Sequence, residues 1–375
     1  MMITGLSGNE IYCLAQKGFV PGNIVLGNSV QSLGMLGGIS SGLQSLAGGE
    51  ITNITQLITE GRHAAIRRME EEATSRGAHG VTGVTSELKT LSGMQEFIAV
   101  GSGVTSLQKT GPFFTTACSG QDLYCQIDAG FEPRHFVIGN VAYSIGLAGG
   151  FKGMLQSMAG GEVREYSQMY NHTRHLALER LEQEAAGFGA NAVVDIQTKI
   201  LAMGGVAREM LMVGTASQHA ALPTGGRPVT SELTGEELWN LAQLGYAPLR
   251  LVLGTSVYSL GIRRGIGAFL SGFSRGEVNE LTKLIYQARE NCLAHIHEEA
   301  NAIGADGVVG VKLFIHEMGG SFVEVMAIGT AIKKNQTITT ATPMLPAQAI
   351  IRDRDTFINT TMPALERNLQ QHGNQ

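Results

Sequence analysis

Three arginines and six glutamates stand at matching places along the chain, where their charges could act together. They are Arg62, Arg174 and Arg289, with Glu72, Glu184 and Glu299, and with Glu96, Glu209 and Glu324. Charged groups beside apolar surface need partners, because burial of an unpaired charge is costly. The pattern therefore predicts a structural ion network, with a carboxylate–arginine ligand site as the alternative. Apart from Ser32, Ser144 and Ser259, no Ser, Cys or His recurs beside these charges, so the sequence offers no nucleophile–base constellation.

Each arginine is expected to meet a glutamate that begins the last strand of a copy. The expected pairs are Arg62 with Glu96, Arg174 with Glu209 and Arg289 with Glu324, within one copy or across a contact. An ion pair requires nitrogen and oxygen atoms about 4 Å apart or closer. We expect such pairs to lie at or near a subunit contact.

A second group of residues carries side chains that bind transition metals. Its members are Cys292, His295, His172 and His175. Cys292 and His295 lie near His297 on one expected helix, and His172 and His175 share a helix face. A zinc site needs several such ligands at suitable spacing, and neither cluster recurs in all three copies. We therefore predict no cofactor and no stoichiometric Zn, Cu or Ni, with a metal site on these residues as the alternative.

The charged positions recur because the chain repeats itself. The phrase "IVLGNSVQSLG" (24–34) returns as "FVIGNVAYSIG" (136–146) and as "LVLGTSVYSLG" (251–261). Self-similarity at a fixed period indicates tandem structural units. We place repeats at 1–112, 113–227 and 228–334. The polar tail at 335–375 is expected to be partly disordered or docked in extended form.

One copy is expected to contain two well-defined helices and three strands. The helix starts "SGNE", "SGQD" and "TGEE" predict a capped short helix, with a capping box in copies 1 and 3 and a glycine at its end. A strand follows, and then a Gly-broken apolar stretch, which we interpret as a short, weak helix. A long helix runs near 50–76, 162–188 and 277–303, and a β-hairpin ends the copy.

The last strand of each copy is apolar on both faces, as Val325 and Met326 illustrate. One long helix cannot cover both faces of so small a sheet, so another copy or another chain must cover the second face. The predicted fold class is α+β. It consists of three tandem domains, each a small antiparallel sheet packed on one long helix, with an extra capped helix at the N-terminal side.

Composition narrows the class of protein further. The 375 residues are 43% hydrophobic, which is enough for two or three domains. A net charge of −5 argues against a general binder of nucleic acid or of anionic membranes. Four cysteines without a regular pattern favour a reducing compartment over a secreted disulfide framework. With no recognisable signal peptide or membrane span, we expect a cytoplasmic protein.

The string "EEANAIGADGVVGVKLFIHEMGG", followed by "VEVMAIGTAI", resembles the YbjQ-like family, whose domains carry a heavy-metal-binding label. The resemblance covers roughly 20–107, 133–220 and 248–334, and copy 3 matches best. It implies a small α+β domain of the dodecin-like kind that assembles into rings, typically pentamers. The capped short helix and the threefold tandem arrangement depart from the family pattern.

These observations favour a non-enzymatic protein that assembles with itself into a ring, stack or cage. The alternatives are a module that binds a metal or small ligand at repeat or subunit interfaces, and an enzyme of unknown class. The preferred arrangement is a pentamer of three-domain chains in which each copy forms its own ring in a three-tier stack. A ring with a multiple of three domains is the other arrangement. The tail at 335–375 is a candidate site for a protein partner.

Overall fold

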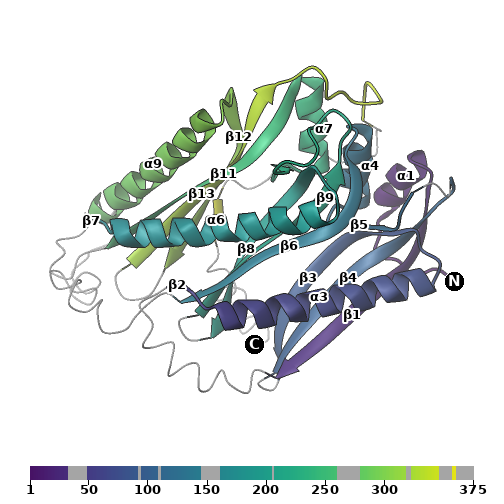
Figure 1. The fold of residues 1–375 in the computed structure, drawn as a ribbon, viewed down its shortest axis with the longest axis horizontal. Helices are drawn as coiled ribbons and strands as arrows, with labels where there is room; N and C mark the ends of the chain where they lie inside the picture. The colour runs from purple at the N-terminus through teal and green to yellow at the C-terminus, as the bar shows by residue number, and fades with distance from the viewer. Residues whose placement is uncertain are drawn as a thin grey trace, which may run out of the picture.

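The structure is a computed structural model that describes residues 1–32, 49–91, 94–108, 111–144, 161–204, 207–259, 279–317, 322–345 and 357–359. Within these residues the chain repeats one set of elements three times (Figure 1). Each set is a short helix, a long strand, a long helix and a β-hairpin. The fold is therefore α+β with three tandem copies, as the sequence predicts.

The elements of the three copies have closely similar lengths. Copy 1 contains α1 (Gly8–Gln16), β1 (Phe19–Ser32), α3 (Thr52–Ser75), β3 (Gly80–Leu91) and β4 (Met94–Ser106). Copy 2 contains α4 (Gly120–Asp128), β6 (Glu132–Ser144), α6 (Arg164–Gly187), β8 (Ala192–Gly204) and β9 (Ala207–Gln218). Copy 3 contains α7 (Gly235–Gln243), β11 (Tyr246–Ser259), α9 (Asn279–Ala302), β12 (Gly307–Glu317) and β13 (Phe322–Lys334). The weak helix expected within each Gly-broken stretch falls outside the described residues.

The short helices begin and end where the sequence predicts. Ser7 and Thr234 each take part in a reciprocal capping box with the glutamate three residues later. In copy 2, Ser119 accepts the Asp122 N–H and donates its hydroxyl proton to the shorter Asp122 carboxylate. The glycine after each helix has a positive φ, between 75° and 83°, which side chains with a Cβ rarely adopt.

A glycine in the repeated strand phrase lets the long helix lie directly on the strand. A Cβ at Gly27 or Gly139 would stand 2.0 Å from a carbonyl oxygen of the long helix, and one at Gly254 would stand 2.5 Å away. Any larger residue would push α3, α6 or α9 off its sheet, because packed interiors leave no room for such an overlap. This close approach explains why the phrase occurs three times.

Each sheet is antiparallel at its centre, with the second hairpin strand in the middle. β4 lies between β1 and β3, β9 between β6 and β8, and β13 between β11 and β12. Short strands extend these sheets from copy to copy. β2 (Gly49–Glu50) and β7 (Gly161–Glu162) pair with β6 and β11 of the following copy. β5 (Phe114–Thr115) and β10 (Val229–Thr230) pair with β3 and β8 of the preceding copy.

Long helices and sheets alternate as layers across the molecule (Figure 1). α3 packs between the sheets of copies 1 and 2, in a core that joins Ile58 and Phe97 to Phe136 and Leu211. α6 packs between the sheets of copies 2 and 3 in the same way. The core under α9 is drawn, among the described residues, from copy 3 alone. The preceding copy thus covers the second face of the sheets of copies 2 and 3, as predicted.

The described part of the tail lies against the body of the protein. The Thr342 hydroxyl and N–H donate to Asp128 at 2.8 and 3.0 Å, and Gln243 donates to the Thr342 carbonyl at 3.3 Å. Further along, β14 (Phe357–Asn359) pairs in parallel with Leu313–Ile315 of β12. Within the described ranges, no helix is both long enough and apolar enough to span a membrane.

Candidate functional site at the repeat interface

Copies 1 and 2 meet through the same contacts as copies 2 and 3, so one interface occurs twice in the chain. The Ile51 N–H donates to the Ala142 carbonyl at 2.8 Å. The Thr55 hydroxyl accepts the Ala142 N–H at 2.9 Å. At the second interface the Val163 N–H donates to the Val257 carbonyl at 2.8 Å, and the Ser167 hydroxyl accepts the Val257 N–H at 2.9 Å. The last residues of the two edge strands, β6 and β11, therefore have their main-chain groups bonded to the preceding copy.

At the centre of the first interface, Arg62 of α3 forms a buried ion pair with Glu209 of β9. Its Nε and Nη2 atoms lie 3.1 and 2.7 Å from the two carboxylate oxygens, and Nη1 donates to Ser86 Oγ at 2.9 Å. Asn140 donates to the same carboxylate at 3.2 Å. Both charged side chains are 0% exposed. Because a bidentate guanidinium–carboxylate pair has a fixed geometry, it specifies how the two copies are oriented.

Arg174 of α6 forms the corresponding pair with Glu324 of β13. Its Nη2 atom lies 2.7 and 2.9 Å from the carboxylate oxygens and donates to the Tyr143 hydroxyl at 2.9 Å. Burial by itself lowers the pKa of the guanidinium, but the adjacent Glu324 carboxylate outweighs it and the pKa is raised. The arginine therefore stays charged, and the interface depends on its partner.

These pairs differ from the expected ones by one copy. Each arginine meets the glutamate of the following copy, because its helix face points away from its own sheet and toward the next one. Glu96 and Arg289 are consequently left at the two ends of the array. Arg289 is 37% exposed and pairs with Glu290 beside it, while Glu96 accepts a bond from the Asn28 side chain at 3.2 Å.

The other recurring glutamates hold strands in place. Glu72, Glu184 and Glu299 accept the N–H groups of Leu26, Ile138 and Leu253. In addition, Glu184 lies 3.1 Å from His63 Nε2, and Glu299 contacts the ring of His175. Each histidine belongs to the preceding copy. The predicted network of arginines and glutamates thus gains two histidines, which the sequence reasoning missed because copy 3 has Glu290 at their position.

We expect His63 to titrate above its ordinary pKa of 6.5. The hydrogen bond to Glu184 raises its pKa more than burial lowers it. A raised pKa means that the pair stabilises the interface fully below about pH 6.5 and loses this contribution as the pH rises through the raised value. Glu184→Gln keeps an acceptor for the Ile138 N–H but removes the charge, so the pKa of His63 should fall. An NMR titration of the ring protons measures this, with His175 as the internal control. An unchanged His63 pKa would contradict the assignment.

The metal-ligand candidates do not form a site in the structure. The buried Cys292 thiol donates to a strand carbonyl at 3.0 Å, and burial raises its pKa. Both ring nitrogens of His175 are engaged, by the Asn171 carbonyl and by Glu299. His172 is exposed on α6. In the part of the chain that the structure describes, no three His, Cys, Asp or Glu side chains are grouped as a metal ion requires. These donors do not fit a transition-metal centre.

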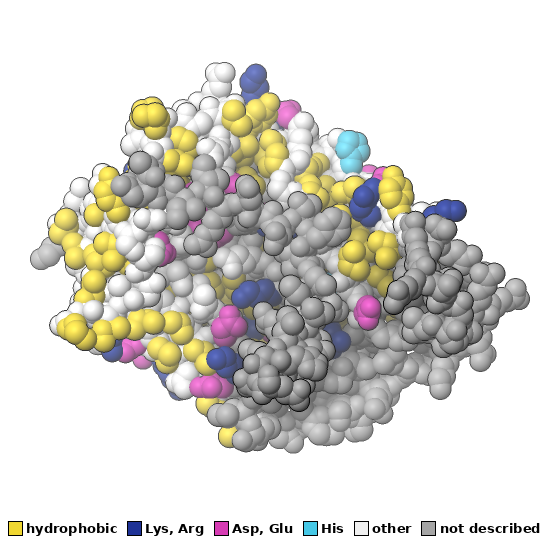
Figure 2. Space-filling view, turned by 180° about the vertical axis from the view of Figure 1, so that it is seen from behind, with side chains coloured by type: hydrophobic (Ala, Val, Ile, Leu, Met, Phe, Trp, Pro, Cys, Tyr) yellow, Lys and Arg dark blue, Asp and Glu magenta, His cyan; other side chains and the backbone are white. Residues whose placement is uncertain are grey.

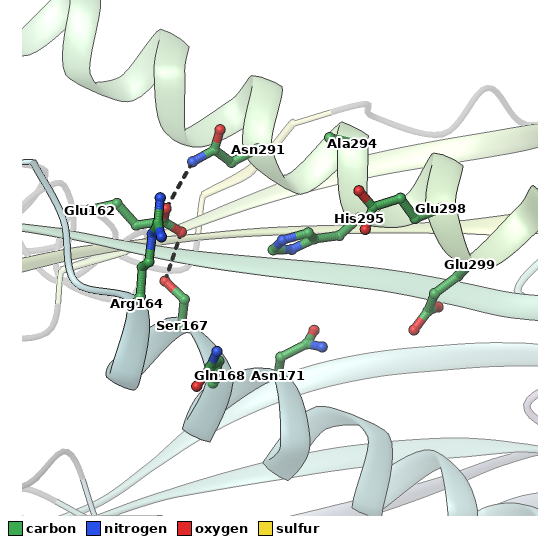
Figure 3. Close-up of a pocket in the computed structure, with 10 residues that line it drawn as sticks. All are labelled: Glu162, Arg164, Ser167, Gln168, Asn171, Asn291, Ala294, His295, Glu298 and Glu299. Carbon is green, nitrogen blue, oxygen red and sulfur yellow. Dashed lines mark hydrogen bonds between the residues drawn. The ribbon is translucent and has the colours of Figure 1, made fainter.

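A polar cavity of about 500 Å³ separates α6 from α9 at the second interface (Figure 3). Glu162 stands at one end, where it accepts a bond from Asn291 at 3.2 Å, and His295 projects into the space from α9. At the first interface the matching place is bridged by an ion pair, 2.8 Å long, between Arg180 and Glu50. His295 occupies the position of Arg180 in copy 3. The shorter imidazole leaves free part of the space that the arginine fills. The lining also differs from the first interface at other positions, such as Asn291, which replaces Leu176, and Asn171, which replaces Thr59.

Copy 1 carries the counterpart of the covered face without its cover. In copy 2 this face holds Phe136 and Ile138, which are buried under α3. The same positions in copy 1 are Ile24 and Leu26, which are exposed, as is Val30. Hydrophobic side chains gather along the edge that copy 1 forms, at the left of Figure 2. An apolar strand face of this kind marks an interaction surface.

Comparisons with known proteins agree with the threefold fold. The chain matches the family described as "Putative heavy-metal-binding" (YbjQ_1) over residues 20–106, 131–220 and 245–335. It is 31% identical over 240 residues, 61% of this chain and 89% of the relative, to the encapsulin nanocompartment protein Rv1762c of Mycobacterium tuberculosis. UPF0145 proteins of Methanoregula boonei and Helicobacter hepaticus are 43% and 34% identical over 81 and 99 residues. These matches span 22% and 26% of this chain and 68% and 96% of the relatives, about one copy each.

Proposed function

The chain belongs to the YbjQ family, and we propose that it is a self-assembling structural protein whose copies are the building blocks of a larger array. One observation carries the proposal. An interface with a buried arginine–glutamate ion pair is made twice within the chain, and its two separate halves remain at the ends. Copy 1 presents the apolar face with Glu96, and copy 3 presents the long helix with Arg289. Surfaces that fit each other on opposite ends of one molecule generate rings or filaments.

The nature of the buried groups supports a structural role over a catalytic one. Arg62 and Arg174 are engaged by carboxylates across the interface, as charges in structural ion networks are. The four cysteines are free and buried, which supports a reducing compartment such as the cytoplasm. The mycobacterial relative carries the name of an encapsulin nanocompartment protein, and an assembly role for this chain is consistent with that name.

The strand pairing between copies within the chain favours one way for chains to combine. A three-tier stack would require the β6 and β11 edges to meet the same copy of another chain. Those edges already pair with β2 and β7 of their own chain. This supports the other arrangement, in which copies follow one another around a single ring or along a filament and their number is a multiple of three. A pentamer of chains would then be one ring of fifteen copies.

The test is the mass of the particle in solution. We expect the 39.8 kDa chain to form complexes of an integral number of chains at micromolar concentration. Light scattering and native mass spectrometry measure that number, and a dilution series separates stable association from transient contact. A monodisperse single chain across the series would contradict the proposal, because the surfaces at the two ends would then be satisfied without a partner.

A further inference from the structure

We infer that chains join through a two-way exchange: the α9 end of one chain packs on copy 1 of the next, and residues 2–4 of that next chain add a strand to β12 of the first. The inference rests on the proposed function and names its partner, a second copy of this chain. It follows from comparing the N-terminal segment, the start of β12 and Gly8 with the residues at the same repeat positions in the two interfaces within the chain.

The strand that precedes each short helix pairs with the previous copy. The Phe114 and Thr116 N–H groups donate to the carbonyls of His79 and Val81 at 3.3 and 2.9 Å. The Thr116 carbonyl in turn accepts the Val84 N–H at 2.9 Å. The second interface repeats all three bonds. The Val229 and Ser231 N–H groups donate to the carbonyls of Asn191 and Val193, each at 2.9 Å, and the Ser231 carbonyl accepts the Ile196 N–H at 3.0 Å. This strand addition is therefore a fixed part of the interface.

The N-terminal segment stands in the same position, and within the described residues no strand of another copy pairs with it. Met2 and Ile3 match Phe114 and Thr115, counted from the cap residue Ser7, which matches Ser119. The Ile3 carbonyl accepts the Ile24 N–H at 2.8 Å, which places the segment along β1. Met2 and Ile3 are 47% and 60% exposed, whereas Thr115 is fully buried. One side of the segment is already bound, and the other faces outward.

The edge that would receive this segment lies on copy 3. Residues 306, 308 and 311 match Asn191, Val193 and Ile196 of copy 2, whose main-chain groups bond to the strand added from copy 3. Val308 and Val311 are only half-buried, whereas the matching Val193 and Ile196 are buried. On the side of β12 away from β13, β14 pairs only with Leu313–Ile315, and no other strand among the described residues pairs with the start of β12 on that side. Within the described residues, this part of the edge can therefore take residues 2–4 of another chain.

A glycine at the start of each short helix gives an independent sign of the same contact. A Cβ at Gly120 would stand 2.7 Å from Glu10 Cβ of α1, and a Cβ at Gly235 would stand 2.1 Å from the Asp122 carbonyl oxygen of α4. These glycines let the short helices of successive copies touch. Gly8 holds the same position in α1, and a Cβ there would meet nothing within 4 Å. No contact with the described residues requires a residue this small at position 8, and its size fits the approach of α7 from another chain.

The charged and polar groups of the two ends are complementary. Arg289 and the exposed Tyr286 lie on the outer side of α9. They match Arg174 and Asn171 of α6, which face the next sheet. Glu96 on the apolar face of copy 1 matches Glu209 and Glu324, the acceptors of the two internal pairs. The contact between chains thus continues an interface that the chain already contains.

Gly8→Gln tests the helix contact, with Gly187→Gln as its matched control. Gly187 is also a helical glycine whose Cβ would meet nothing within 4 Å, and both changes favour the helix, so neither should unfold the chain. We expect Gly8→Gln to raise the dissociation constant between chains about 30-fold or more, the effect of a central interface residue. Gly187→Gln should associate like the wild type. Sedimentation velocity over a dilution series measures both.

Thr4→Pro tests the strand addition, with Thr4→Val as its control. Proline removes the N–H that matches those of Thr116 and Ser231, whereas valine keeps it. We expect only the proline variant to associate weakly. If Gly8→Gln and Thr4→Pro both associate like an oligomeric wild type, this inference is overturned while the proposed function stands. That result would mean that chains join without adding a strand to β12. A wild type that stays a single chain would overturn both.

Discussion

Glu324→Gln should lower the free energy of unfolding of the region around copies 2 and 3 by about 3–5 kcal/mol, the cost of leaving one buried charge without its counterion. Glu324 is 2% exposed, and its carboxylate is the counterion of the fully buried Arg174. The amide has almost the same shape and still accepts hydrogen bonds, so the loss reports the missing charge. Urea unfolding followed by the fluorescence of Trp239, which lies in copy 3, measures the change.

Glu96→Gln is the matched control, because the same repeat position lies at the uncovered end of the array. Glu96 is half-buried and accepts a hydrogen bond from the neutral Asn28 side chain, so the change should cost less than about 1 kcal/mol in the single chain. A second control replaces Arg174 and Glu324 together by leucine, which removes both charges and should recover much of the lost stability. Equal losses in Glu96→Gln and Glu324→Gln, measured at a dilution at which the protein is a single chain, would show that the buried ion pair is not what stabilises the interface within the chain.

The comparison of the expected and observed pairs shows what a repeated sequence can and cannot specify. The capped helices, the long helices and the hairpins depend on neighbours close in sequence, such as Ser7 with Glu10, and they form where the pattern predicts them. The partner of Arg174 depends instead on how two copies are layered. Because Glu209 and Glu324 occupy the same repeat position, the sequence is equally consistent with either partner. Arg174 pairs with Glu324 because the face of α6 that carries the arginine points toward the sheet of copy 3.

One contact between copies could have been predicted from a hydroxyl residue that recurs in all three long helices. Thr55, Ser167 and Thr282 keep a hydroxyl two helical turns before the recurring arginine, and in copies 1 and 2 this hydroxyl accepts a strand N–H of the next copy. The cavity beside His295 left no such signal, because its lining depends on positions where the copies differ, such as His295 and Asn291. A residue that recurs points to the shared interface, and a residue that breaks the repeat points to a local difference between interfaces.

Arg289→Glu should strongly weaken association of the chain with itself, because the end that normally offers a cation would then present a carboxylate to Glu96. Glu96→Arg should do the same, since two arginines would meet. Charge pairs at the centre of an interface affect dissociation strongly, and we expect each variant to weaken association by about 30-fold or more. Arg289 is exposed in the single chain, so its replacement should leave the fold of that chain intact.

Mixing the two variants distinguishes a head-to-tail contact from any other contact. In the mixture, the introduced glutamate of the first variant meets the introduced arginine of the second, and the unchanged Arg289 of the second meets the unchanged Glu96 of the first. Both joints then carry opposite charges, so the two variants should alternate in open arrays and in rings of an even number of chains, although each associates only weakly with itself. A ring of an odd number of chains should not close from the mixture. Like charges prevent either variant from joining its own kind. Native mass spectrometry with one variant isotopically labelled counts the chains of each kind, and an equal number of both is expected. A mixture that stays as single chains, or variants that each assemble alone, would show that Arg289 and Glu96 do not meet.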